Sequence, residues 1–196
     1  MMSDYVLPCG GDWTVDDLDV LPFEFRYELI DGWLDLPQRG NLSQLGGAAL
    51  LGSLKERQPE GYRLVPRMPL WSDEEDVPWP DIVVLGPGGD GDVVLVVDVV
   101  DPYLLFADML DRVARLSAMG VPAYWVFEDG SESCLGGGLS EFRRAVGSGF
   151  ETVTRTREVF TTEVPYPVTV DLPAISNWWP MVFTYRGNYW DREENQ

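Results

Sequence analysis

Three segments decide the fold of this chain, and they read WPDIVVL at 79–85, VVLVVDVV at 93–100 and GVPAYWVF at 120–127. Each segment is almost entirely apolar. This composition is typical of strands covered on both faces of a sheet, because such strands have no side that must meet water. The first two segments carry one acid each, Asp81 near the start and Asp98 in the middle. Burying an ionised carboxylate is costly unless another group pairs with it. We therefore expect Asp81 and Asp98 to hold a cation or to cap a neighbouring element.

Sequence patterns around these segments predict helices and further strands. The expected elements begin with a helix capped by Thr14, a hairpin over 27–36, a helix over 41–57 and a strand over 62–70. After the central segments come a turn at 101–102, a helix over 105–119, short strands within 141–164 and an extended segment over 165–175. The hairpin is indicated by alternating residues around Asp31-Gly32, a two-residue turn signal. Gly120 is a suitable residue to follow the helix over 105–119. This order predicts an α/β domain in which a mixed β-sheet is flanked by helices.

Charge and composition exclude several classes of function. Fourteen basic residues against 33 acidic ones give a net charge of −19, and Lys55 is the single lysine. Such a field repels nucleic acid over the molecule as a whole. The chain contains no histidine, which excludes imidazole-ligated zinc and histidine-activated nucleophiles. Asp and Glu remain as ligands for hard cations, which favours Mg²⁺ or Mn²⁺.

The chain reads as a protein of the cytoplasm. No apolar run approaches the roughly 18 residues of a membrane span, and the first residues lack the pattern of a signal peptide. Two cysteines, Cys9 and Cys134, do not make a disulfide framework. Near the C-terminus, residues 178–190 are dense in aromatic side chains. These could stack on nucleic-acid bases, cover a sheet edge or form a homodimer contact.

Asp81 and Asp98 are the first candidates for a functional site. They lie on consecutive predicted strands, so neighbouring strands would bring the two carboxylates close enough to share a divalent ion. Arg112 and Arg115 follow on the next predicted helix. A cation held by two carboxylates can polarise a phosphodiester and lower the pKa of bound water, and a nearby basic group can stabilise phosphate charge.

Four segments together resemble a known family, and they read RYELIDG at 26–32, PDIVV at 80–84, VDVVDP at 97–102 and GVPAYW at 120–125. In this order and spacing, the chain resembles the Uma2 family of restriction-type endonucleases, a branch of the PD-(D/E)XK nuclease superfamily. The resemblance runs from about Trp13 to Ile175. Each motif alone is weak, and the specificity lies in the combination.

The family usually shows a Glu near a strand end, then an Asp and, four residues later, a Lys. Without any gap, Asp98 takes the place of the Glu, Asp108 that of the Asp and Arg112 that of the Lys. The resemblance implies a restriction-endonuclease-like α/β fold, with one nuclease-fold domain over 1–175 and an aromatic-rich tail over 176–196.

The resemblance also implies a function. Uma2-like proteins are expected to be metal-dependent endonucleases that hydrolyse DNA phosphodiester bonds with Mg²⁺ or Mn²⁺. Here Asp81 and Asp98 would bind the metal, Glu28 would assist it or position water, and Arg112 would stand in for the lysine. Each carboxylate also has a structural explanation: Asp81 could cap a turn, and Asp98 and Glu28 could be exposed to solvent.

The departures from the family pattern support a second hypothesis. Arg112 is not a conservative replacement for lysine, because a guanidinium keeps its proton and is a planar fork rather than a point charge. It could also simply pair with Asp108 one turn earlier on the helix. The family's histidine is absent, and Ser43 is its nearest counterpart. The chain could therefore be a catalytically degenerate nuclease-fold protein, a binding or regulatory module whose acidic surface meets a basic protein.

Overall fold

The structure is a computed structural model, and it describes residues 12–18, 21, 27–35, 41–70, 77–88, 91–100, 106–128, 137–145, 147 and 149–176. Within these ranges, the side chains of residues 35, 41–45 and 106–108 are not described. The expected turn at 101–102, both cysteines and nearly all of the aromatic-rich C-terminal segment lie outside the described residues. No helix in the described ranges is long and apolar enough to cross a membrane.

The central element is a six-stranded sheet in the order β3-β4-β5-β6-β7-β8. Its middle strands are the three segments that decide the fold: β4 (Ile82–Leu85), β5 (Val93–Val100) and β6 (Ala123–Glu128). The outer strands are β3 (Arg63–Pro66), β7 (Gly138–Arg144) and β8 (Phe150–Thr156). Only β5 and β6 pair in parallel within this sheet, and its other neighbours are antiparallel. The predicted fold class, a mixed β-sheet flanked by helices, is confirmed.

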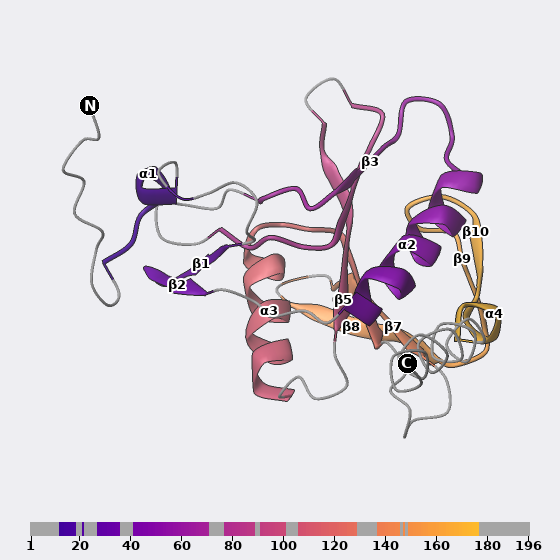
Figure 1. The fold of residues 1–196 in the computed structure, drawn as a ribbon. Helices are drawn as coiled ribbons and strands as arrows, with labels where there is room; N and C mark the ends of the chain where they lie inside the picture. The colour runs from indigo at the N-terminus through magenta and orange to yellow at the C-terminus, as the bar shows by residue number, and fades with distance from the viewer. Residues whose placement is uncertain are drawn as a thin grey trace, which may run out of the picture.

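Different elements cover the two faces of the sheet (Figure 1). One face packs against α2 (Asn41–Glu56), the hairpin β9–β10 (Val159–Thr162 and Val168–Asp171) and α4 (Leu172–Ser176). The other face packs against α3 (Phe106–Ala118). Successive side chains of a strand point to opposite faces. Val97 and Val99 therefore belong to the first core, and Val96 and Val100 to the second. Asp98 consequently points to the α3 side.

A separate hairpin lies on the α3 side, formed by β1 (Glu28–Ile30) and β2 (Trp33–Asp35). Its turn residues Asp31 and Gly32 have φ values of 48° and 73°. Two positive φ angles are what a type I′ turn requires, so the predicted Asp-Gly hairpin is confirmed. Leu29 is buried with Trp13 and Val77, and the alternation turns Glu28 to the opposite side of the hairpin.

The C-terminal part of the described chain differs from the sequence prediction. Residues 165–175 were expected to be extended, but only Val168–Asp171 forms a strand, and α4 begins directly after it. The Asp171 carboxylate accepts a hydrogen bond from the Ala174 N–H at 2.9 Å. This is an N-cap, which satisfies a free donor of the first turn and starts the helix. At the N-terminus, Thr14 was expected to cap a helix, and it donates to Asp17 just before α1 (Val15–Leu18).

Tyr166 connects the β9–β10 region to α2, and it gives a testable pH dependence. Its buried hydroxyl donates to the Leu54 carbonyl at 2.9 Å. Burial, with a smaller contribution from Tyr62, raises the pKa of Tyr166 to about 12. Because the unfolded chain ionises at the ordinary value near 10, this stabilisation is present below about pH 10 and is lost as the pH rises toward 12.

We expect Tyr166→Phe to cost about 1 kcal/mol at neutral pH through the lost hydrogen bond. The difference in unfolding free energy between the two proteins should shrink above pH 10, because ionisation of the phenol stabilises the unfolded state of the wild type and has no counterpart in the variant. Urea unfolding followed at several pH values measures this. A difference that stays constant up to pH 12 would contradict the prediction.

Candidate active site

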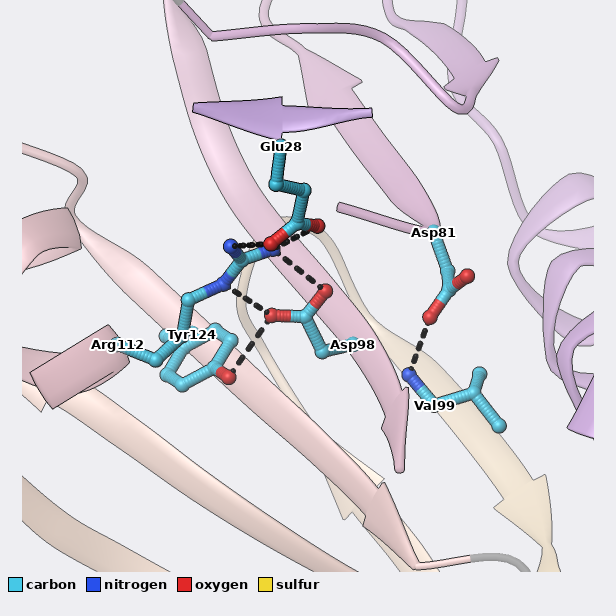
Figure 2. A network of polar contacts seen from close by, with 6 residues as sticks. All are labelled: Glu28, Asp81, Asp98, Val99, Arg112 and Tyr124. Carbon is cyan, nitrogen blue, oxygen red and sulfur yellow. Dashed lines mark hydrogen bonds and ion pairs between the residues drawn. The ribbon is translucent and has the colours of Figure 1, made fainter. Parts of the chain in front are cut away.

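Arg112 joins two carboxylates that are far apart in the sequence (Figure 2). Its Nη1 donates to Glu28 Oε2 at 2.8 Å, and its Nε donates to Asp98 Oδ2 at 2.9 Å. Its Nη2 completes both pairs, with 3.2 Å to Asp98 Oδ1 and 3.4 Å to Glu28 Oε1. One guanidinium therefore holds two carboxylates, each through both of its oxygens.

Each member of this cluster comes from a different element. Glu28 opens β1, Asp98 lies near the end of β5, and Arg112 lies in the middle of α3. All three side chains are largely removed from water, with exposed fractions of 8% for Glu28, 3% for Asp98 and 13% for Arg112. A buried carboxylate is tolerated where a cation pairs with it, and here the guanidinium is that cation.

The charge state of Arg112 is fixed by these neighbours. Burial alone would lower the pKa of Arg112, but the carboxylates of Asp98 and Glu28 outweigh burial and raise it above the ordinary value. Arg112 therefore remains a cation at any working pH and cannot act as a proton acceptor. Its chemical capacity is to neutralise negative charge and to donate hydrogen bonds.

Asp98 has a further partner that the sequence analysis missed. The Tyr124 hydroxyl, on β6, donates to Asp98 Oδ2 at 2.9 Å. Tyr124 is 1% exposed. One signal could have identified it: its hydroxyl is the polar exception in an otherwise apolar run, and it lies on the strand expected next to Asp98.

Asp81 lies beside the same strand but makes a different contact. Its Oδ2 accepts a hydrogen bond from the main-chain N–H of Val99 at 2.7 Å. In Figure 2 the Asp81 carboxylate points to Val99, whereas the Asp98 carboxylate points to Arg112 and Tyr124. The predicted adjacency of the two strands is confirmed. That one ion bridges Asp81 and Asp98 stays a prediction.

The remaining sequence candidates lie around this cluster. Arg115, one turn after Arg112, donates to Asp31 Oδ2 at the hairpin turn at 2.9 Å. The two arginines of α3 thus both hold the β1–β2 hairpin. The alternative in which Arg112 pairs with Asp108 concerns a side chain outside the described ones, as does the suggested counterpart Ser43. Arg112 itself pairs with Glu28 and Asp98.

The carboxylate oxygens of Glu28 and Asp98 are suitable ligands for a divalent cation, but they already contact Arg112. Carboxylate oxygens are the ligands that Mg²⁺ and Mn²⁺ prefer, and a cation, the guanidinium, already bridges Glu28 and Asp98 as a stand-in. Among the described residues, no group of three or more acidic or cysteine side chains converges on a metal-sized site. Asp98, with Asp81 or Glu28, would hold a metal only once Arg112 has released these oxygens.

Comparison with known proteins shows a shared fold. No protein-family model matches the chain, and a search of curated proteins finds no match. Among solved structures, the chain is similar to a candidate nuclease belonging to DUF820, a Uma2-like family, from Anabaena variabilis ATCC 29413. The TM-score is 0.61 at 13% sequence identity, over 84% of this chain and 98% of that chain. The chain therefore has the fold of this nuclease candidate, with Glu28, Asp98, Arg112 and Tyr124 clustered on the α3 side of its sheet.

Proposed function

We propose that this protein is a Uma2-like, metal-dependent DNA endonuclease of low activity. One observation carries the proposal: β1, β5 and α3 deliver Glu28, Asp98 and Arg112 to a single point within the fold of a nuclease candidate. Two acids and a permanent cation at one point, with Asp81 just before the adjoining strand, are the groups that phosphodiester hydrolysis needs. Mg²⁺ or Mn²⁺ is the proposed cofactor, and the cytoplasm the proposed location.

The chain's own residues would divide the work as follows. A bound divalent metal supplies polarisation of the phosphate and an activated water. Asp98 and Asp81 provide anionic oxygens that hold the metal, and Glu28 orients water beside it. Arg112, once it has left the carboxylates, neutralises charge that develops on the phosphate.

Low activity follows from the contacts of Arg112. Four hydrogen bonds of its guanidinium go to Glu28 and Asp98, out of the five N–H donors that an arginine has. A phosphate can therefore accept two hydrogen bonds from Arg112 only by displacing a carboxylate. The same displacement is needed before a metal can reach Asp98. Both steps must break charge-assisted hydrogen bonds of Arg112, so only a small fraction of the molecules is in the state that can bind metal and phosphate.

The experiment that tests this function is nicking of supercoiled plasmid with Mg²⁺ or Mn²⁺. We expect slow, metal-dependent nicking by the wild type and none by Asp98→Asn, which keeps the shape of the side chain and removes its charge. Asp171→Asn, at the α4 cap, is the matched control and should nick like the wild type. No nicking by the wild type, or equal nicking by Asp98→Asn, would reject the endonuclease proposal.

A second candidate function is favoured by one specific observation. The guanidinium contacts both oxygens of Glu28 and both of Asp98 as a permanent internal cation, and a buried ion-paired cluster of this kind can serve structure alone. Under this proposal the protein is a non-catalytic binding module, and its net charge of −19 favours a basic protein over DNA as partner. An absence of nicking, with the fold intact, is the result that this candidate requires.

A further inference from the structure

We infer that Tyr124 is the positioning residue of the candidate active site, holding Asp98 in place through its hydroxyl. The inference rests on the proposed function and concerns Asp98 Oδ2, which accepts from both Tyr124 Oη and Arg112 Nε at 2.9 Å. These two donors differ in how firmly they are held. Arg112 has a long side chain on a helix, whereas Tyr124 belongs to a central strand.

The ring of Tyr124 is fixed by packing. It stacks on Phe142 with a centroid distance of 5.9 Å and an interplanar angle of 26°, and Phe150 lies against it at 6.2 Å. Phe142 lies on β7, which pairs with the strand of Tyr124, and Phe150 lies on β8, the next strand of the sheet. Tyr124 is 1% exposed, and a side chain packed in this way keeps its hydroxyl in one place, because a close-packed interior leaves no room for another position.

The consequence concerns the state in which Arg112 has left. Asp98 then loses the guanidinium but keeps the Tyr124 hydrogen bond, so its carboxylate stays aimed at the α3 side. Without the hydroxyl, the carboxylate would lose this hydrogen bond at the moment when a metal must bind it. Tyr124 thus acts through Asp98 and touches neither metal nor substrate.

The test uses a matched pair of hydroxyl deletions, Tyr124→Phe and Tyr166→Phe. Both tyrosines are buried and donate one hydrogen bond of 2.9 Å, but only Tyr124 contacts Asp98. In the Arg112→Lys background, we expect Tyr124→Phe to weaken Mn²⁺ binding, measured by calorimetry, about tenfold, the equivalent of one hydrogen bond to a charged group. Tyr166→Phe should leave it unchanged. Equal Mn²⁺ affinities in the two variants would overturn the inference.

A second measurement keeps this test separate from the nuclease proposal. Tyr124→Phe should lower the urea midpoint of the wild type but not that of Asp98→Ala, because the hydroxyl acts through Asp98. Replacing Tyr124 with 4-aminophenylalanine restores a hydrogen-bond donor and should therefore recover the urea midpoint. This variant can also be measured if Tyr124→Phe does not fold. Equal loss in both backgrounds, or no recovery by the donor, would overturn the inference. If no variant binds Mn²⁺ while this coupling holds, the metal-dependent function fails and the role of Tyr124 stands.

Discussion

Replacing Arg112 with methionine should destabilise the protein by about 3–5 kcal/mol, the range measured when one partner of a buried ion pair is removed. Methionine keeps most of the side-chain volume, so the loss reports charge rather than a cavity. The reason is that the buried side chains of Glu28 and Asp98, 8% and 3% exposed, would lose the guanidinium that pairs with both. An exposed pair with Asp108 would have cost at most about 1 kcal/mol, so the size of the effect distinguishes the two arrangements.

The matched control is Arg115→Met, three residues further along the same helix. Its partner Asp31 has a side chain that is 80% exposed, and an ion pair open to water contributes little. We expect this variant to lose less than about 1 kcal/mol. Urea unfolding of the three proteins in one buffer measures both changes. Similar losses for Arg112→Met and Arg115→Met would contradict the buried three-residue cluster.

The Arg112→Met protein should also respond to divalent cations more strongly than the wild type. Two buried carboxylates without a guanidinium repel each other, and an ion that binds only the folded state stabilises it by mass action. Thermal unfolding with and without millimolar Mn²⁺ measures the response. The same melting temperature with and without the ion would show that the oxygens cannot serve as metal ligands.

The core of the fold was predictable because its signals are local. The apolar segments at 82–85, 93–100 and 123–128 are typical of buried strands. Asp31-Gly32 indicates a two-residue turn whose backbone needs positive φ at both residues. Helix α3 was predicted at 105–119 and observed at Phe106–Ala118. Where the signal was weaker, after residue 164, one cap residue, Asp171, decided between a longer strand and a helix.

The sequence indicated candidate residues for a site but not the contacts among them. Asp98 was a candidate because it interrupts an apolar segment, and Glu28 and Arg112 were assigned roles through the family resemblance. Neither signal says that a guanidinium from α3 reaches 84 residues back to β1. That contact depends on how the hairpin docks on the helix, which is a property of tertiary packing. The Tyr124–Asp98 bond was missed for the same reason, since it depends on the register between β5 and β6.

The contact made by Asp81 could not be predicted from the sequence either. Two acids on neighbouring strands were expected to face one cation, and the strands are indeed neighbours. Asp81 nevertheless gives one oxygen to the Val99 N–H, because it stands just before the start of β4, where the Val99 N–H lies within its reach. A main-chain donor of this kind leaves no trace in residue identity, so the sequence could not distinguish a ligand from a cap.

Arg112→Lys should strengthen divalent-metal binding at least about tenfold and raise plasmid nicking with it. A lysine ammonium is a compact point charge without the planar fork of donors of a guanidinium, so it cannot contact both oxygens of Glu28 and both of Asp98 at once. Losing even one hydrogen bond to a charged group corresponds to about 1.5–3 kcal/mol, and 1.4 kcal/mol is a factor of ten in a binding constant. The carboxylates released in this way become available to Mg²⁺ or Mn²⁺, while a positive charge remains beside them for the phosphate.

Mn²⁺ calorimetry and plasmid nicking should compare the wild type with Arg112→Lys and Arg115→Lys. Arg115→Lys is the control, because it carries the same substitution at an arginine that does not contact Glu28 or Asp98. A rise in both metal binding and nicking in Arg112→Lys alone would identify the guanidinium as the cause of low activity. Tighter metal binding without any nicking would separate the two roles: the carboxylates would be metal ligands, but the scaffold would lack catalysis. In that case the non-catalytic binding module would replace the endonuclease as the proposed function, because replacing the guanidinium by an ammonium would have released the acids without producing a phosphodiesterase.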